Sequence, residues 1–589
     1  MRRLLVGFFA AIGVLAVLLV IAVTVVVVRL RPSTPPLPGK IILSVDLTQG
    51  LAEGGGETGW LRLVAGGKPS LRDFLDALEA AGADPRVKGL LARVGDDELG
   101  LAKVQQVRDA ITAFRAKGKF AIAFADSFGE FGDGTRPYYL ASAFDRIWLQ
   151  PMGSVGLTGL YSDAPFVKGT LDLLGVVAEF DHRGRYKTAA NVLTETQMTP
   201  PGREQVEDLL SSLGGQVVDG IAEGRRLSPQ TVRALIDRGP FLAGEALKAK
   251  LVDRLGYRDE VIAAAHKRAG SDAEIVSLPT YLARATRPHR QGARIALIYG
   301  SGLIVSGNGS AGLLAPPDEM AASRITRAFR DAVRDPKVRA ILFRIDSPGG
   351  SVVASETIWR DVVFARERGK PVIVSMGDVA GSGGYYIAAP ADKIVAEPAT
   401  LTGSIGVLGG KLVLAGLLKK IGISTDAAAF GANASMSSAT SPFSPFARSR
   451  LEAFLDASYQ GFKAHVASGR HMTADQVEAI AKGRVWTGEE AKAHGLVDAL
   501  GGYEVALRLA RKAAGIAQGA PIELKLFPPE EGLAEFLYNR LTGQGDDDNG
   551  PGVSALGRAV EAAAPLQQRI DAALDASAVL LMPPIGEPR

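Results

Sequence analysis

Apolar and polar positions along this chain follow two patterns, one typical of buried strands and one of helices that pack by a single face. Residues 340–345 (AILFRI) and 371–376 (PVIVSM) are short apolar runs, and we expect each to form a buried strand. Residues 325–335 and 355–369 carry apolar side chains at i, i+3 and i+4, the spacing of packed helices. Strands alternating with helices predict parallel βαβ units, hence an α/β fold.

The N-terminal pattern is different. Residues 4–28 form a run of 25 residues without a charge, and a helix needs roughly 20 apolar residues to span a bilayer. A cleaved signal peptide is the alternative, although its apolar core is usually about 7–15 residues long. We therefore predict one transmembrane anchor at 1–30, followed by a Pro-rich linker at 31–39. A single anchor at this end places the bulk of the chain outside the cytoplasm.

The chain contains an internal repeat. The segment ADPRVKGLLARV (83–94) aligns with RDPKVRAILFRI (334–345) at an offset of 251 residues. An offset of 247 then pairs Tyr138-Tyr139 with Tyr385-Tyr386. A register kept over this length indicates a tandem duplication, with repeats at 40–289 and 290–540 and a flexible tail at 541–589.

Composition narrows the function. The net charge of +4 is too small to indicate nucleic-acid binding, and the absence of cysteine excludes disulfides, thiol catalysis and thiolate metal sites.

Two glycine-rich turns follow successive predicted strands of the second repeat. RIDSPGGSV contains Gly349 and Gly350, whose N–H groups would face an anionic oxygen near a helix N-terminus. GDVAGSGGYY contains Ser382, a candidate nucleophile, followed by Gly383 as a further oxyanion donor. Because such strand ends converge on one crevice, the two turns predict one site.

A serine nucleophile needs a base, and the repeat suggests where it lies. The 247-residue offset pairs Lys187 of the first repeat with Ala434, and Ser382 with Thr135. Each repeat has therefore kept one part, and neither repeat alone could perform serine chemistry.

These motifs together resemble signal peptide peptidase A, the protease IV family, in its long, duplicated, membrane-bound form. The resemblance rests on DSPGG, GSGGYYIA, LTGSIGV, GRYKTA and GEEAKAHGLVD, and covers about residues 40–540 plus the anchor. One departure is Gly381, where the family often has alanine.

The resemblance implies a crotonase-like fold related to the Clp-type proteases, in tandem copies. It assigns Ser382 as nucleophile, Lys187 as general base and Ser404 as the residue that orients the lysine, with Gly383, Gly349 and Gly350 as oxyanion donors. No cofactor or metal is implied. The expected substrates are apolar peptides, most plausibly cleaved signal peptides. The expected assembly is a homotetramer in the cytoplasmic membrane, with its bulk on the periplasmic side.

Three other functions stay open at this point. An α/β-hydrolase would use a histidine after the serine, with His465, His471 and His494 as the options. A crotonase-like acyl-CoA enzyme would need neither the serine nor the anchor. A catalytically inactive membrane scaffold is the third, since duplicated enzymes sometimes lose activity.

Overall fold

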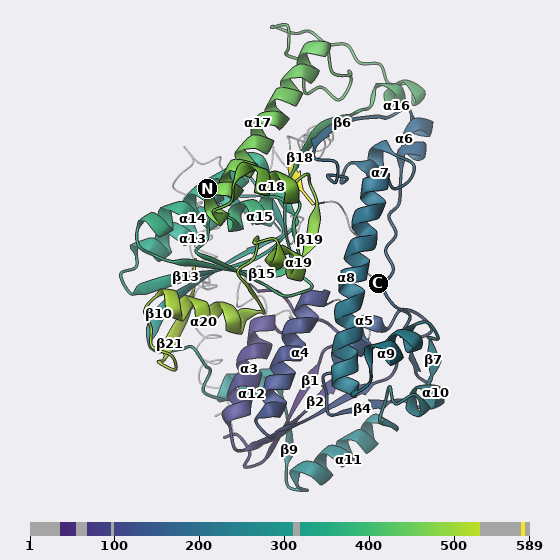
Figure 1. Ribbon diagram of the computed structural model, residues 1–589, viewed down its shortest axis with the longest axis vertical. Helices are drawn as coiled ribbons and strands as arrows, with labels where there is room; N and C mark the ends of the chain where they lie inside the picture. The colour runs from purple at the N-terminus through teal and green to yellow at the C-terminus, as the bar shows by residue number, and fades with distance from the viewer. Residues whose placement is uncertain (1–35, 55–67, 96–98, 310–318, 530–578, 583–589) are drawn as a thin grey trace, which may run out of the picture.

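The computed structural model describes residues 36–54, 68–95, 99–309, 319–529 and 579–582, which form two sheet-and-helix units, one below the other in Figure 1. The predicted anchor at 1–30 lies outside these residues. Among the residues described, no helix combines the length and apolar character needed to cross a bilayer.

The first unit is built on a parallel sheet of six strands. Every residue of its central strand β3 is buried, as expected when helices cover both faces of a parallel sheet. In spatial order the strands are β8 (Arg254–Leu255), β4 (Arg146–Leu149), β3 (Phe120–Ala125), β2 (Val87–Arg93), β1 (Ile41–Asp46) and β9 (Glu274–Ser277).

The second unit repeats this sheet strand for strand. Its matching parallel strands, in the same spatial order, are β20 (Ala499–Leu500), β16 (Lys393–Ala396), β15 (Val372–Gly381), β13 (Val338–Ser347), β10 (Ala293–Ser301) and β21 (Ile522–Leu526). β17 (Leu401–Gly403) pairs with the far end of β15, and β19 (Val485–Thr487) pairs with β17. The shared strand order establishes the duplication, while its exact boundary near residue 289 stays a prediction.

Helices flank both sheets (Figure 1). Those of the first unit are α3 (Leu71–Ala83), α4 (Leu101–Ala116), α5 (Thr135–Ala141), α6 (Lys168–Leu174), α7 (Asn191–Thr194), α8 (Pro200–Arg225), α9 (Pro229–Ile236), α10 (Ala243–Lys248), α11 (Arg258–Ala269) and α12 (Leu278–Arg284). Those of the second are α13 (Ala322–Arg334), α14 (Val352–Glu367), α15 (Gly383–Ala388), α16 (Ala415–Lys420), α17 (Pro445–Arg470), α18 (Ala474–Ile480), α19 (Gly488–Ala493) and α20 (Tyr503–Ala513).

The duplication extends to helix capping. The 26-residue helices α8 and α17 each begin with proline after a hydroxyl N-cap. The Thr199 hydroxyl accepts the Gly202 N–H, and the Ser444 hydroxyl accepts the Ala447 N–H. A hydroxyl cap contributes about 1 kcal/mol to a helix, so both copies keep the same local start signal.

A third sheet joins the two units. Its order is β12 (Glu319–Ala321), β11 (Leu303–Val305), β14 (Gly349–Ser351), β22 (Val579–Leu581), β18 (Val407–Val413) and β6 (Val177–Arg183). Only β6 comes from the first unit, and β22 comes from the segment predicted as a flexible tail. A short pair, β5 (Ser154–Val155) with β7 (Phe241–Leu242), completes the strands described.

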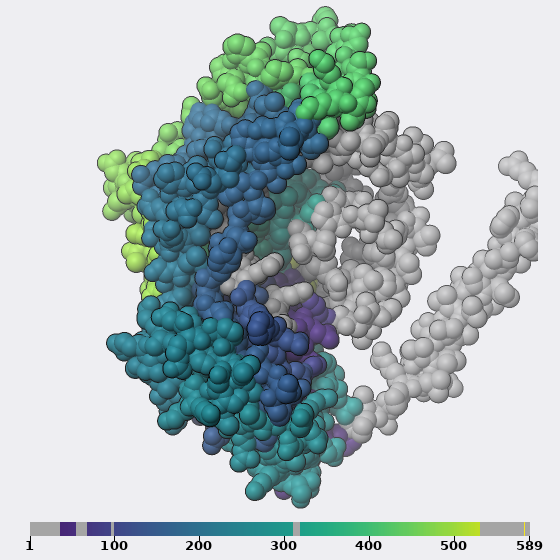
Figure 2. All heavy atoms as spheres, turned by 90° about the vertical axis from the view of Figure 1, so that its right-hand side faces the viewer, coloured from purple at the N-terminus to yellow at the C-terminus, as the bar shows by residue number. Residues whose placement is uncertain are grey.

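The extensions of the two units lie side by side at one end of the molecule. In Figures 1 and 2 the blue segment carrying α6 and β6 lies against the green segment carrying α16 and α17. β6 and β18 pair antiparallel along their full length, from Val407 opposite Arg183 to Val413 opposite Val177. The first unit therefore reaches into the second through a continuous strand pair.

Candidate active site

Ser382 lies in the turn between strand β15 and helix α15. Its φ is 53°, a left-handed value uncommon for a residue with a side chain. Its N–H donates to the Gly403 carbonyl at 2.8 Å, and its own carbonyl accepts the Tyr386 N–H at 2.8 Å. Strained backbone of this kind costs about 1–3 kcal/mol and is often found at functional sites.

The register of β6 against β18 carries Lys187 to this turn. Arg183, the last residue of β6, pairs with Val407, the first of β18. The chain continues from Arg183 through a turn to Lys187, and Ser404 lies just before Val407. The antiparallel pairing therefore brings Lys187 and Ser404 together, although they are far apart in sequence.

Lys187 and Ser382 are in contact within one chain. Lys187 Nζ lies 2.6 Å from Ser382 Oγ, and it donates to the Ser404 carbonyl at 3.0 Å and to Ser404 Oγ at 2.9 Å. All three side chains are buried. A neutral amine has two N–H donors and one lone pair, so two donors can go to Ser404 while the lone pair accepts the Ser382 hydroxyl proton.

Burial holds the pKa of Lys187 well below its ordinary value. Removing an ammonium from water disfavours the charged form, and its three oxygen partners belong to uncharged serines. The site therefore favours the neutral amine, which is the form that can take a proton from a hydroxyl.

Gly383 and the Gly349-Gly350 turn also converge on Ser382. A Cβ on Gly383 would lie 3.1 Å from both Gly349 Cα and Gly350 N, so the two turns touch. Gly349 has φ 106°, and its N–H donates to Ser347 Oγ at 3.2 Å. All the residues predicted for the site are thus within one cluster, and their catalytic roles stay predictions.

The residues that correspond to Ser382 and Lys187 in the opposite repeat do not form a serine–lysine pair. Thr135, the counterpart of Ser382, is buried, and its hydroxyl accepts the N–H groups of Thr158 at 3.1 Å and Gly159 at 3.0 Å. Ala434, the counterpart of Lys187, is exposed. The Thr135 hydroxyl therefore stabilises the turn that contains Thr158 and Gly159.

The three histidines considered for an α/β-hydrolase lie in other contacts. His465 stacks on Trp359 and its Nε2 lies 3.0 Å from Glu356. His471 ends helix α17, and His494 ends α19 beside Trp486. Because the basic side chain in contact with Ser382 Oγ is that of Lys187, the geometry does not support a histidine triad.

A buried ion cluster joins the first unit to the two glycine-rich turns of the candidate site. Lys103 Nζ of α4 lies 2.9 Å from Asp346, 3.2 Å from Glu53 and 3.2 Å from Asp378. Asp346 precedes the Gly349-Gly350 turn, and Asp378 precedes Ser382. The Lys103 N–H also donates to Asp378 at 2.9 Å, and the Asp346 carboxylate accepts the Val379 N–H at 3.0 Å.

The cluster has one carboxylate more than it has cations, since Arg344 pairs with Glu53. Burial lowers the pKa of Lys103, but Asp346, Glu53 and Asp378 raise it by more, so the ammonium stays charged. Burial raises the pKa of Asp346 to about 6, against the lowering effect of Lys103. One lysine of the first unit thereby fixes two strand ends of the second.

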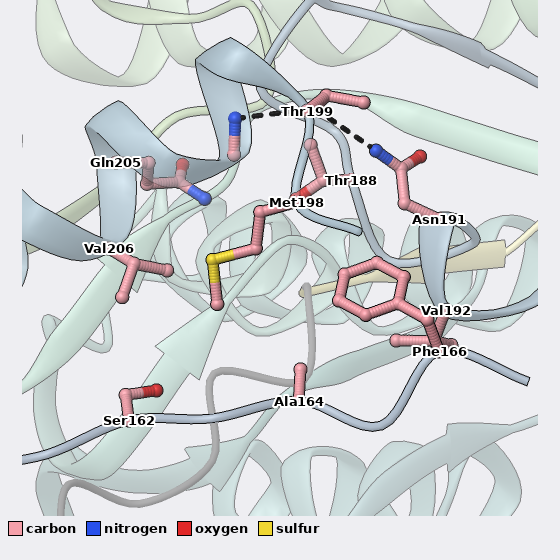
Figure 3. Close-up of a pocket in the computed structure, with 11 residues that line it drawn as sticks. Ser162, Ala164, Phe166, Thr188, Asn191, Val192, Met198, Thr199, Gln205 and Val206 are labelled. Carbon is pink, nitrogen blue, oxygen red and sulfur yellow. Dashed lines mark hydrogen bonds between the residues drawn. The ribbon is translucent and has the colours of Figure 1, made fainter. Parts of the chain in front are cut away.

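A largely apolar pocket begins at Thr188, the residue after Lys187. It is lined by residues from three consecutive segments of the first unit: Ser162, Ala164, Phe166, Thr188, Asn191, Val192, Met198, Thr199, Gly202, Gln205 and Val206. Figure 3 shows Met198 between Val206 and Phe166, with Thr188 above it. Asn191 donates to the Thr199 hydroxyl at 3.2 Å, which fixes the rim.

Asp76, Glu79 and His289 form a separate group with metal-ligating side chains. His289 Nδ1 lies 3.9 Å from Asp76 and 3.8 Å from Glu79, while Arg72 lies 3.6 Å from Asp76. The cationic partner on Asp76 competes with any metal, and we assign none. The expectation that the enzyme needs no cofactor stays a prediction.

Sequence reasoning missed Lys103, the pocket and strand β22. The partners of Lys103 lie up to 275 positions away, so no local pattern shows the cluster. Asp346 in DSPGG and Asp378 in GDVAG stand near strand ends, which is the one feature of the sequence that points to this cluster.

Comparisons with known proteins identify the family of this chain. Residues 113–272 and 365–517 each match peptidase family S49. The chain is 34% identical over 489 residues to Protease 4 of Salmonella typhi, covering 80% of this chain and 76% of that protein. It is 32% identical over 478 residues to the chloroplastic serine protease SPPA of Arabidopsis thaliana, covering 80% and 69%.

Among solved structures, a ClpP1 variant from Listeria monocytogenes overlaps 36% of this chain and 95% of its own length, with 15% identity and a TM-score of 0.23. The family match includes both units, and the long relatives share most of their length with this chain. The protein belongs to peptidase family S49 and is a serine peptidase.

Proposed function

We propose that this peptidase uses a Ser382/Lys187 dyad to hydrolyse apolar peptides, of which released signal peptides are the best candidates. The observation that carries the proposal is the 2.6 Å contact between Lys187 Nζ and Ser382 Oγ. The amine is buried, has only serine oxygens as partners and is favoured in its neutral form.

The reaction runs in two halves. Ser382 Oγ attacks the substrate carbonyl carbon, and its proton passes to Lys187 Nζ. The resulting ammonium gives that proton to the leaving amine, which leaves an acyl-enzyme. Water then attacks the ester carbonyl, Lys187 takes a proton from the water, and the proton returns to Ser382 Oγ as the acid product leaves.

The neighbouring groups support this chemistry. Ser404 accepts two hydrogen bonds from Nζ and thereby directs the lone pair toward Ser382. Backbone N–H groups of Gly383, Gly350 and Gly349 would stabilise the oxyanion, and of these Gly349 already donates to Ser347. The apolar side chains of the pocket beside Thr188 suit apolar substrate residues.

The same proposal includes the setting of the enzyme. The uncharged run at 4–28 would anchor it in the cytoplasmic membrane with its bulk in the periplasm, where signal peptides are released. A homotetramer is the assembly that the family resemblance favours. Fractionation of the full chain and its mass in detergent would test these two points.

Hydrolysis of an apolar peptide ester by the full chain tests the chemistry. Removing either dyad residue, by Ser382→Ala or Lys187→Ala, should lower kcat by at least about 10⁴-fold, as for other catalytic units. Substituting His465, His471 and His494 together by glutamine should leave kcat within a few-fold of wild type. Wild-type rates in both dyad variants would refute the proposal, and a triple variant without activity would favour the histidine alternative.

A further inference from the structure

Residues 482–485 form a short segment that packs directly against the backbone of Lys187. The Lys482 carbonyl accepts the Tyr186 N–H at 2.9 Å, which fixes the residue before Lys187. Gly483 follows, and a Cβ on it would lie 2.5 Å from Lys187 N, 2.8 Å from Lys187 Cα and 2.7 Å from Lys187 Cβ. These separations are about 1 Å shorter than an ordinary contact between non-bonded atoms. Only a residue without a side chain therefore fits at this position.

The same segment also fixes Ser404, the hydrogen-bond acceptor of the Lys187 amine. The Ser404 N–H donates to the Arg484 carbonyl at 2.7 Å, and the Gly483 N–H donates to the Ile405 carbonyl at 2.8 Å. One stretch of backbone thus holds the lysine on one side and its serine acceptor on the other. The place of Lys187 relative to Ser404 therefore depends on how closely Gly483 lets the lysine backbone approach.

Both units of the molecule hold the segment in place. The Lys482 N–H donates to the Tyr459 hydroxyl of α17 at 3.1 Å, and α17 belongs to the second unit. The Val485 N–H donates to Gln205 Oε1 of α8 at 2.8 Å, and α8 belongs to the first unit. Gln205 is buried, so this acceptor is shielded from water. The segment is therefore fixed from two directions before it contacts Lys187.

The first repeat has no glycine at the position of Gly483. FLAGEALKAKLVD (241–253) aligns with WTGEEAKAHGLVD (486–498) at an offset of 245 residues, which pairs Gly483 with Arg238. The Arg238 guanidinium lies over the Phe241 ring, 5.6 Å from its centroid. Glycine is thus present only in the copy of the segment that packs on a lysine.

We propose that Gly483 is a positioning residue of this peptidase, which sets the place of Lys187 relative to Ser404, and hence to Ser382, by direct backbone packing. The inference rests on the proposed function, because it treats Lys187 as the base. It adds a requirement that the dyad alone does not include, namely a residue without a side chain against the lysine backbone.

Hydrolysis of an apolar peptide ester by full-length Gly483→Ala tests the proposal. The added methyl group must displace the Lys187 backbone by about 1 Å, and a displacement of this size can lower a rate by about 100-fold. We expect kcat to fall by about that factor, with KM nearly unchanged because the variant leaves the apolar pocket intact. A wild-type kcat in Gly483→Ala would overturn the proposal.

Gly515→Ala is the matched control for backbone strain. Gly515 has φ 63° and Gly483 has φ 79°, so alanine is strained at both positions. A Cβ on Gly515, however, would have no heavy atom within 4 Å. Gly515→Ala should therefore keep the wild-type kcat. An equal fall in both variants would mean that strain, and not contact with Lys187, causes the loss, and would overturn the proposal.

The pH profile separates a displaced lysine from a smaller amount of folded enzyme. The value of kcat/KM rises with pH as the base of the free enzyme loses its proton. Burial holds the pKa of Lys187 low, so a lysine pushed out of its place should have a higher pKa. The rise in Gly483→Ala should therefore move to higher pH. A profile lowered equally at every pH would indicate loss of folded enzyme and overturn the proposal.

Tyr459→Phe covers the case in which Gly483→Ala does not fold. It removes the hydroxyl that accepts the Lys482 N–H and so loosens the segment. The loss of one hydrogen bond corresponds to about 2- to 10-fold, and we expect kcat to fall by that factor with the same shift of the pH profile. Tyr138→Phe, which removes a buried hydroxyl bonded to the Leu251 carbonyl at 2.8 Å, is the matched control and should match wild type. A wild-type kcat in Tyr459→Phe would also contradict the proposal.

Failure of this inference can be distinguished from failure of the proposed function. If Ser382→Ala and Lys187→Ala are inactive while Gly483→Ala matches wild type, only the positioning role is wrong. If the two dyad variants keep wild-type rates, the proposed function itself fails.

Discussion

Lys187 is buried among uncharged oxygens, and this position has a consequence for stability as well as for catalysis. Its pKa is lower in the folded chain than in the unfolded chain, so unfolding takes up a proton at every pH between the two values. Over that window the free energy of unfolding rises with pH, and the rise ends at the ordinary lysine pKa.

We therefore expect Lys187→Met, which cannot be protonated, to lack this rise. Urea unfolding of wild type and variant at pH 6, 7.5 and 9 measures the difference between their free energies of unfolding. That difference should shift in favour of wild type as the pH rises. A difference independent of pH would mean that Lys187 is charged in the folded protein.

Ser404 is the second prediction at this scale. Removing its hydroxyl in Ser404→Ala leaves the backbone carbonyl as the remaining Ser404 acceptor for Nζ. Residues that orient metal ligands contribute about 10–100-fold to activity, and by analogy we expect the kcat of Ser404→Ala to fall by about that factor with KM unchanged.

Ser404 has φ 50°, which glycine adopts without strain. Ser404→Gly is thus the matched control, because it removes the hydroxyl and relieves the backbone. Both variants should lose kcat alike. An active Ser404→Gly enzyme would show that the hydroxyl is dispensable.

At the scale of elements, helix α4 holds the strand ends that precede the Gly349-Gly350 turn and the Ser382 turn. Lys103→Met leaves Asp346, Glu53 and Asp378 facing one another without their shared cation. Breaking a buried ion pair from one side costs about 3–5 kcal/mol, and we expect a loss of this size in the free energy of unfolding.

Lys103→Met should also lower kcat, because the Lys103 ion cluster positions both the Gly349-Gly350 turn and the Ser382 turn. Lys103→Arg keeps the charge and should recover part of each loss. Calorimetry and steady-state kinetics on the three chains measure both effects. A stable Lys103→Met with full kcat would separate the cluster from the active site.

The alternation of apolar runs and helical spacing predicted parallel βαβ units and an α/β fold, whereas the order of the strands in each sheet depends on pairing between distant segments and was not predicted. Ser382 and Lys187 could be predicted because the repeat offset showed which copy had lost each residue. Ser404 came only from the family resemblance, since its position depends on the β6–β18 pairing. The Lys103 ion cluster and strand β22 depend on contacts between segments that are far apart in the chain. A single sequence does not reveal such contacts.

At the scale of the whole molecule, the two units are one enzyme. β6 of the first unit completes a sheet of the second, and Lys187 reaches Ser382 within a single chain. Mixing full-length Ser382→Ala with full-length Lys187→Ala should therefore give no activity, whatever the oligomer. Recovered activity in the mixture would indicate a dyad formed between subunits.

The central claim is that Ser382 attacks the substrate and that Lys187 makes the attack possible. Intact mass after mixing the full chain with an apolar peptide ester measures this directly, with the modified residue located by digestion. The account predicts an acyl group on Ser382 within the first turnovers of wild type, and at least about 10³-fold slower acylation in Lys187→Met. Acylation of Lys187→Met at the wild-type rate, or at another residue, would contradict it.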